Sequence, residues 1–511
     1  MSTQSSNLYR PNTAFDLLRL PILGKLLKRR YGRLILQIPL LIVALLLIWD
    51  GFTGPALASE NLATIAPWVH YRGLVVIALL LVGNLFCMGC PFTLTRTLGK
   101  KLALRGHRFP KALRNKWLAI AGLFLVFFLY EWLDLWASPL LTAWVIVAYF
   151  AASFALEAIF TESAFCKYVC PLGTFNFVYS TVSPFQIGAR DPNVCHTCVG
   201  KECVNGSYRE SPLIVIDQIG VNGAPTATHT DGPQGTLGCG TLLFVPQIKS
   251  NMECVACLDC ARACPHDNVG LMARKPGAEL LRADSFPQRW DLSFLLICLA
   301  FMGLVNAFGM IAPVYGLIAS MATALGLTSL GLSDLAIEGI VVFIIFFIGT
   351  ILLPIGLSLI TAWLARLLTN TVKRDALRVT LSSFAPAFVP IGLGFWVAHY
   401  GYHFLTGVLT IVPAAQRFLL QHGIGALGDP NWTLAGVLDV NTIGLIQSIA
   451  LLGGFLGSLY VAQQIAIRLY RRDSMAGLLP WALLFLLMIA AGMWLFAQPM
   501  EMRGTLQFIS S

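Results

Sequence analysis

The chain has 511 residues, of which 57% are hydrophobic and only 12% are charged. Because a soluble protein of this length carries roughly a quarter charged residues, the composition excludes an ordinary water-soluble enzyme. The formal net charge of +10 could indicate a nucleic-acid partner. The basic residues instead gather in alternate loops between apolar segments, which is the pattern of positively charged cytoplasmic loops in membrane proteins.

Those basic residues are Lys25, Lys28, Arg29, Arg30 and Arg33, then Arg96, Lys100, Lys101, Arg105, Arg108, Lys111, Arg114 and Lys116, then Lys373, Arg374 and Arg378, and finally Arg468, Arg471 and Arg472. We find no nucleic-acid footprint among them. Their placement orients the chain with its N-terminus in the cytoplasm. We therefore expect a multi-pass protein of a prokaryotic plasma (inner) membrane.

Apolar stretches of about 20 residues recur, each long enough to cross a hydrocarbon core of roughly 30 Å. Lipid forces backbone polar groups to pair within each span, so the predicted fold class is a mainly α-helical polytopic membrane protein. Nine spans fit: roughly 34–52, 71–89, 117–136, 140–162, 290–312, 336–366, 378–411, 440–466 and 477–497. Nine crossings put the C-terminus outside. The apolar, Gly-rich segment 300–335 could add a re-entrant or interfacial helix.

The predicted organisation has four parts. A basic N-terminal segment, 1–33, precedes a four-span unit, 34–184; a polar insert, 185–285, separates it from a five-span unit, 286–511. The insert carries turn residues and eight of the thirteen cysteines. Span parity places it in the cytoplasm, where a reducing environment favours metal-bound thiolates over disulfides.

The most specific motif of the insert is formed by Cys254, Cys257, Cys260 and Cys264, followed at once by Pro265. This C-x-x-C-x-x-C-x-x-x-C-P run is the one that bacterial ferredoxins use for iron–sulfur clusters. Its first three cysteines hold one cluster, and the fourth ligates the other. A zinc site is the alternative. We therefore predict that the insert is a two-cluster, ferredoxin-like α+β domain.

The remaining cysteines of the insert complete the count. Cys195, Cys198 and Cys203 form a C-x-x-C-x-x-x-x-C pattern, and a single Cys239 follows. The crossover rule assigns one 4Fe–4S cluster to Cys195, Cys198, Cys203 and Cys264, and a second to Cys239, Cys254, Cys257 and Cys260. His196 and His266 are interpreted as polar loop residues.

Four more cysteines precede prolines near the predicted ends of the second and fourth spans: Cys87 and Cys90 before Pro91, and Cys166 and Cys170 before Pro171. We expect each span to stop at its proline, which cannot continue a helix. Both pairs would then lie at the cytoplasmic face. They could form a third metal centre or redox-active dithiols, or they could be structural cysteines. Cys298, alone in an apolar segment, is interpreted as a packing residue.

These motifs resemble those of the NosR/NapH-like membrane polyferredoxins, a group that includes the nitrous-oxide reductase regulator and the quinol-oxidising component of periplasmic nitrate reduction. The likeness covers roughly residues 34–280 and rests on Phe86–Pro91, Phe165–Pro171 and the ferredoxin-type cysteines. It implies electron transfer between the cytoplasm, the quinone pool and an extracytoplasmic partner.

Three features depart from that family. The first pair has C-x-x-C rather than C-x-x-x-C spacing, which puts the role of Cys87 and Cys90 in doubt. No extracytoplasmic flavin-binding region precedes the first span, and five spans follow the insert. The last two departures argue against assigning nitrous-oxide respiration.

His399 and His403 lie four residues apart in a late apolar segment, so both imidazoles project from one helix face. Ionisable groups inside a membrane tend to mark function. A b-type haem, a metal such as copper, or a quinone headgroup could use them, and a hydrogen-bonded structural pair is the alternative. Haem normally takes ligands from opposite sides, which one such pair cannot supply. His422, in the following outer loop, could join the pair. His70 is expected on the same outer side of the membrane.

The leading hypothesis is a membrane-bound electron-transfer protein that serves as an oxidoreductase component. It would pass electrons between a cytoplasmic donor or acceptor and quinone or an extracytoplasmic redox protein. The alternatives are a copper-reducing assembly factor for a respiratory metalloenzyme and a redox-sensing regulatory subunit. Glu131, Asp134 and Glu157 are interpreted as residues that cap helices, anchor the interface or pair with buried polar groups, with proton or quinone chemistry as the alternative.

Overall fold

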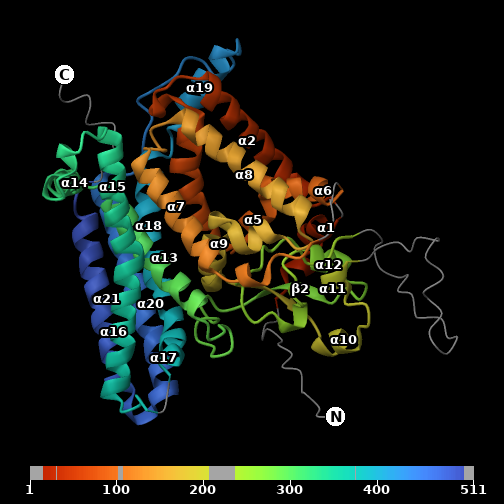
Figure 1. Cartoon of the computed structure of the whole chain (residues 1–511). Coiled ribbons are helices and arrows are strands. Elements are labelled where there is room, and N and C mark those ends of the chain that lie inside the picture. Colours follow the sequence, from red (N-terminus) through yellow and green to blue (C-terminus); the bar gives the residue numbers. More distant parts are fainter. Residues whose placement is uncertain (1–14, 30, 102–106, 207–235, 374–375, 500–511) are drawn as a thin grey trace.

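The computed structural model describes residues 15–29, 31–101, 107–206, 236–373 and 376–499 (Figure 1). The fold is mainly helical and contains one small two-stranded sheet. Three residues of the basic loops fall outside the described residues: Arg30, Arg105 and Arg374. The C-terminal end, which is predicted to lie outside the membrane, also falls outside them.

The main helices of the first half are α2 (Leu34–Thr53), α3 (Leu62–Ile65), α4 (Arg72–Leu81), α5 (Leu85–Gly89), α6 (Leu94–Lys101), α7 (Trp117–Trp132), α8 (Pro139–Ile159) and α9 (Pro171–Tyr179). Those of the second half are α13 (Trp290–Phe308), α14 (Pro313–Ala324), α15 (Asp334–Phe347), α16 (Leu353–Leu368), α17 (Leu377–Phe384), α18 (Phe388–Gly407), α19 (Ile411–Gln421), α20 (Val440–Tyr470) and α21 (Ser474–Phe496).

Seven continuous apolar helical segments in the described part of the chain are long enough to cross a membrane. They are Leu34–Thr53, Leu62–Leu81, Pro139–Ile159, Trp290–Phe308, Asp334–Leu368, Leu377–Gly407 and Val440–Phe496. The last contains two packed helices, α20 and α21, joined by a single turn, Arg471–Asp473. Helix α7 is apolar but shorter, and so is α14, which lies within the segment expected to hold an extra helix. The protein is therefore membrane-embedded.

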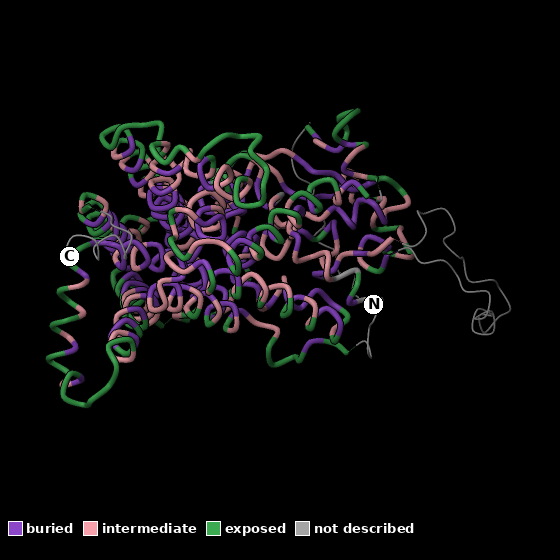
Figure 2. The backbone as a smooth tube through the Cα atoms, turned by 90° about the horizontal axis from the view of Figure 1, so that it is seen from above, coloured by how far each residue is buried: buried purple, intermediate pink, exposed green. Residues whose placement is uncertain are grey.

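Two helices form the buried centre of the membrane unit. Helices α13 and α18 are buried along most of their length, whereas the other long helices expose a wide apolar face. Figure 2 shows the buried backbone concentrated in the interior and the exposed backbone at the periphery. Such helices carry apolar side chains on the faces that pack in the protein interior and on the faces that are exposed. A lipid environment tolerates this arrangement, because lipid tails are as apolar as exposed Leu or Ile side chains.

The cysteine-rich region lies against one end of the membrane unit, away from α14 and α19 (Figure 1). Its sheet pairs β1 (Phe185–Ala189) with β2 (Val269–Ala273) in antiparallel register, with Ile187 opposite Leu271. Three short helices belong to the same region: α10 (Pro192–Thr197), α11 (Glu202–Asn205) and α12 (Asp259–Ala263). The sheet therefore brings the first and last parts of the insert together, and with them the two cysteine motifs.

The described part of the basic N-terminal segment packs on this cysteine-rich region. Leu18 and Leu27 join its apolar core. Asp16 accepts hydrogen bonds from the backbone N–H of Leu271 (3.0 Å) and from Arg190 (Nε to Oδ2, 2.8 Å). The sequence analysis treated residues 1–33 as separate from the insert, because contacts between distant segments leave no local signal in the sequence.

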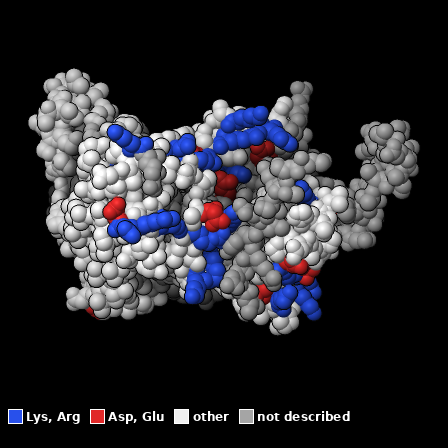
Figure 3. Space-filling view, turned by 90° about the horizontal axis from the view of Figure 1, so that it is seen from below, with Lys and Arg blue, Asp and Glu red and all other residues white. Residues whose placement is uncertain are grey.

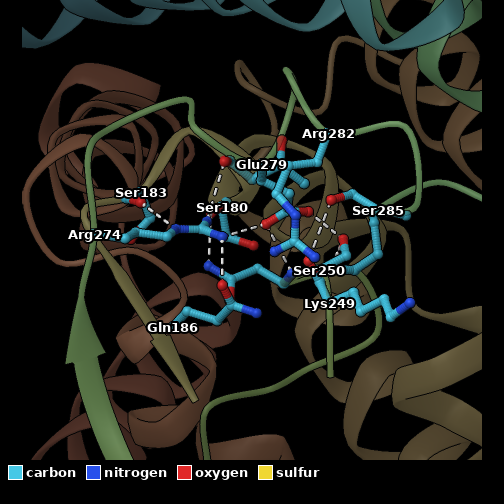
Figure 4. Close-up of polar contacts among 12 residues, drawn as sticks. Ser180, Ser183, Gln186, Lys249, Ser250, Arg274, Glu279, Arg282 and Ser285 are labelled. Atoms are coloured by element: carbon cyan, nitrogen blue, oxygen red, sulfur yellow. Dashed lines mark hydrogen bonds and ion pairs between the residues drawn. The ribbon is translucent and has the colours of Figure 1, made fainter. Parts of the chain in front are cut away.

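Arg274, just after β2, fixes the segment through which the chain leaves α9 and enters β1. Its guanidinium donates to the carbonyls of Ser180, Thr181 and Ser183 and to the side chain of Gln186, at 2.9–3.2 Å. It also forms an ion pair with Glu279 (Nη1 to Oε2, 2.6 Å). Figure 4 shows these groups converging on the guanidinium. Five directed donors make arginine suited to such a junction.

Basic side chains outnumber acidic ones on the face seen from below in Figure 3. This face lies at the same end of the molecule as the turn between α16 and α17 (Figure 1). The concentration of positive charge at one end is what the positive-inside rule describes.

Candidate metal centres

Cysteines far apart in the sequence meet in a first set formed by Cys195, Cys198, Cys203 and Cys264. Cys203 lies within electrostatic range of the other three thiols. Together the four line one cavity, closed on its other sides by Phe244, Val245, Asn268 and their neighbours. Cys264 comes from the second motif, so the chain crosses over as the ferredoxin-type pattern predicts.

Local structure positions this first set. Asp191 caps α10 by accepting the N–H of Asn193 (3.0 Å), and the helix then carries Cys195. Asn268 donates to the sulfur of Cys195 through Nδ2 (3.1 Å) and to that of Cys264 through its backbone N–H (3.4 Å). Such N–H···S contacts hold the two sulfurs near each other and are among the interactions that tune iron–sulfur sites.

The second set comprises Cys239, Cys254, Cys257 and Cys260. Cys260 lies within electrostatic range of the other three and also of Cys203 in the first set. Three residues of the intervening turns, Glu253, Ala256 and Leu258, have positive φ angles. A non-glycine residue with positive φ is uncommon, and three within six residues mark a tightly turning loop around Cys254 and Cys257.

A third set joins the two remaining motifs. Cys166 lies within electrostatic range of Cys87, Cys90 and Cys170. Cys87 in turn lies within range of Cys257 in the second set. A cavity between these two sets is lined by Cys87, Cys166, Cys257, Arg33 and Glu157, among others. The three sets therefore follow one another from the cysteine-rich region toward the membrane unit.

The expectation that each span ends at its proline was wrong. The second span ends at Leu81, a turn follows at Gly83 (φ 74°), and Cys87 lies on the separate short helix α5. The fourth span ends at Ile159, and Cys166 lies on the following turn, Phe165–Val169. Each proline begins the next helical segment, where its missing N–H costs nothing.

Buried amides hold these cysteine segments in place. Asn176 on α9 donates to the sulfur of Cys87 (3.3 Å), Gln37 on α2 donates to the carbonyl of Cys90 (3.1 Å), and Asn84 donates to the carbonyl of Cys254 (2.8 Å). The sequence analysis missed all three. An amide within an otherwise apolar segment is the signal that could have found Gln37 and Asn176.

Burial affects the protonation of the cysteine-rich region. It raises the pKa of Cys203 and that of Cys254 to about 12. Both thiols are therefore protonated at neutral pH unless a positively charged group binds them, and metal binding at these sites would release protons.

His399 and His403 lie on α18 with their ring centroids 5.1 Å apart. His399 is completely buried, and its Nε2 lies 3.1 Å from the sulfur of Met310. The two other candidate histidines bond elsewhere. His70 contacts the carbonyls of Ile65 and Val408, and His422 contacts Trp49 and the carbonyl of Phe418. His422 therefore does not join the pair.

Of the three acidic residues singled out in or near the spans, Glu131 and Glu157 are buried and Asp134 is partly buried. Glu131 and Glu157 are each about 1% exposed. Glu131 accepts a hydrogen bond from Asn306 (3.0 Å) and lies within electrostatic range of Arg72, while Glu157 faces Cys166. Arg72 is enclosed by the rings of Trp68, Tyr130 and Tyr400, at 4.1–4.9 Å from their centroids. The sequence analysis did not single out Arg72 or Met310.

Cys298 lies in the apolar core of α13, apart from the three sets. Among the described residues, no three or more His, Cys, Asp or Glu side chains converge closely enough to hold a single metal ion. The four cysteines of the first set are instead found together in the lining of one cavity.

No protein-family model matches the chain, and no curated protein and no solved structure is significantly similar to it.

Proposed function

We propose that this protein is a membrane-bound iron–sulfur electron carrier of the NosR/NapH-like kind. The observation that carries the proposal is the exchange of cysteines between the two motifs, with Cys264 beside the first motif and Cys239 beside the second. In this proposal each set of four holds one 4Fe–4S cluster. Such clusters accept and release electrons one at a time at potentials tuned by their surroundings.

The chain's own residues support this role by placing the sets in series. Cys203 and Cys260 link the first set to the second, and Cys257 and Cys87 link the second to the span-end set. We propose that this third set holds a further metal centre at the membrane. A cytoplasmic donor or acceptor would exchange electrons at the exposed end, where Val199 lies in solvent. Quinone or an extracytoplasmic protein would do so at the membrane end.

The nine-crossing topology, the cytoplasmic position of the insert and the inner-membrane location belong to the same proposal. The concentration of basic side chains at the end of the molecule that carries the insert supports them (Figure 3).

Anaerobic purification with iron and acid-labile sulfide counts tests the ligand sets. We expect about eight iron atoms per chain for two clusters, and about twelve if the third set binds a cluster as well. Cys264→Ala should lower the count by the content of the first set and remove its electron paramagnetic resonance signal. The matched control is Cys298→Ala, which should leave iron and spectra unchanged. Colourless protein that contains zinc would overturn the proposal.

The electron-transfer role is tested by stopped-flow kinetics on protein in lipid nanodiscs. Clusters reduced with dithionite should be re-oxidised rapidly by a soluble quinone analogue. When a soluble protein donor supplies the electrons instead, Cys264→Ala should slow the reduction of the quinone analogue. Clusters that are present but inert to quinones would point to the redox-sensing alternative.

A further inference from the structure

Two imidazole nitrogens remain unsatisfied in the buried centre of the membrane unit. His399 Nδ1 and His403 Nε2 are buried and have no hydrogen-bond partner among the residues that the structure describes. His399 is 0% exposed and His403 is 6% exposed. Leaving such a group buried and unpaired destabilises the fold. By contrast, both ring nitrogens of His70 face backbone carbonyls, at 3.2 and 3.1 Å.

The third member of this cluster is a methionine from another helix segment. Met310 follows α13, is 2% exposed, and places its sulfur 3.1 Å from His399 Nε2. A thioether is only a weak hydrogen-bond acceptor, so this contact does little to satisfy the imidazole. Nitrogen and sulfur are, however, a pair of atoms that a soft metal ion can bind together.

The distances are close to those of a shared metal. Two imidazoles bound to one tetrahedral ion have ring centroids roughly 5 Å apart, and a bound nitrogen and sulfur lie about 3.5 Å apart. The ring centroids of His399 and His403 are 5.1 Å apart, and the nitrogen–sulfur distance is 3.1 Å. In such a site His399 would bind through Nε2, the nitrogen beside the Met310 sulfur, and His403 would bind through its unpartnered Nε2.

The ligand types and the local charge select the ion. Thioether and imidazole together favour monovalent copper over zinc or iron. Arg72 lies within electrostatic range of both imidazoles. A neighbouring positive charge in a medium of low dielectric constant opposes a divalent cation twice as strongly as a monovalent one. Glu131, within range of Arg72, offsets part of that charge.

We propose that Met310, His399 and His403 form a binding site for Cu(I) inside the membrane unit. Haem is disfavoured because the two histidines project from one face of one helix. A quinone headgroup has no use for the thioether. This site is separate from the three cysteine sets and does not depend on the proposed iron–sulfur function.

Competition with a chromophoric Cu(I) chelator tests the site in the full chain as purified under anaerobic conditions. Wild-type protein should withdraw one copper ion per chain. Met310→Leu should weaken that binding at least tenfold, and His403→Gln should abolish it. Met302→Leu is the matched control, because Met302 lies on α13 and is 1% exposed. X-ray absorption at the copper edge should show two nitrogens and one sulfur.

Three results would overturn the site: no copper uptake by the wild type, equal uptake by Met310→Leu, or a copper shell made only of sulfur. The last would place copper on the cysteine sets. Iron and sulfide counts of Met310→Leu should equal those of the wild type, so that failure of this site and failure of the iron–sulfur proposal are distinguishable.

Discussion

At the scale of single residues, buried polar groups determine how the cysteine-rich region is held. Asp16 is an example, because its carboxylate adds side-chain bonds to the backbone bond that the N–H of Ala273 on β2 donates to the carbonyl of Phe15 (3.0 Å). It accepts from Arg190, from the N–H of Leu18 (2.9 Å) and from the N–H of Leu271. Hydrogen bonds to a charged group contribute more than neutral ones, about 1.5–3 kcal/mol each.

Asp16→Asn should therefore detach the N-terminal segment. The amide keeps one acceptor oxygen but loses the charge that Arg190 pairs with. We expect cleavage by a protease between Leu17 and Lys28 to accelerate about tenfold or more, corresponding to a loss of about 1.5–3 kcal/mol. Asp429→Asn, at an exposed position of the loop after α19, should cleave at the wild-type rate. Equal rates for both variants would show that the carboxylate does not hold this segment.

At the scale of helices, α18 and α20 approach each other through glycines. A Cβ atom on Gly454 would lie 2.7 Å from the carbonyl oxygen of Pro390, and one on Gly394 would lie 2.7 Å from that of Ala450. Small residues at such crossings let two backbones pack closely within a membrane. Gly453, the neighbour of Gly454, has nothing within 4 Å of the same position.

Gly454→Ala and Gly453→Ala should consequently have opposite effects. The first forces the helices apart and should destabilise the protein by about 1–3 kcal/mol, as overpacking does. The second faces outward and gains helix propensity of up to about 1 kcal/mol. Thermal unfolding in detergent, followed by tryptophan fluorescence, measures both. A lower midpoint for Gly453→Ala as well would mean that loss of glycine itself, rather than the helix contact, is responsible.

The helices themselves were largely predictable, because apolar stretches of membrane length have a direct sequence signal. Helix ends near the cysteines were not. The turn at Gly83 and the turn at Phe165–Val169 lie against the insert. Asn84 donates to the carbonyl of Cys254, and Lys167 donates to the carbonyl of Thr241. The ligand sets expected from the cysteine spacing stay a prediction, although their thiols lie near one another. The residues around them, including Arg72 and Met310, come together only through tertiary packing.

At the scale of the whole molecule, a small ion-pair network joins the cysteine-rich region to the membrane unit. Glu253 immediately precedes Cys254 and pairs with Lys116 (3.0 Å) and Lys167 (3.2 Å). Burial alone would raise the pKa of Glu253, but the two lysines outweigh it and hold the pKa below its ordinary value. The sequence analysis treated Lys116 only as a basic residue that orients the chain in the membrane. It treated Lys167 only as part of the motif around Cys166.

This depressed pKa predicts an acid-sensitive contact. The undocked state binds the proton more readily, so the stabilisation is present at neutral pH and is lost as the pH falls below about 4. Glu253→Gln should remove it at every pH and speed hydrogen exchange of residues 250–264 roughly 10–100-fold at pH 7, for about 1.5–3 kcal/mol. Wild type should approach the variant only in acid. Identical exchange of the two proteins at neutral pH would rule out this role.

The exchange of Cys239 and Cys264 between motifs also has a consequence for biosynthesis. On the proposed ligand sets, the second centre needs the chain as far as Cys260 and the first needs it as far as Cys264, both of which follow the first four hydrophobic segments. A product truncated before Cys254 would therefore leave both centres incomplete, whereas one that ends between Cys260 and Cys264 would hold the ligands of the second centre alone.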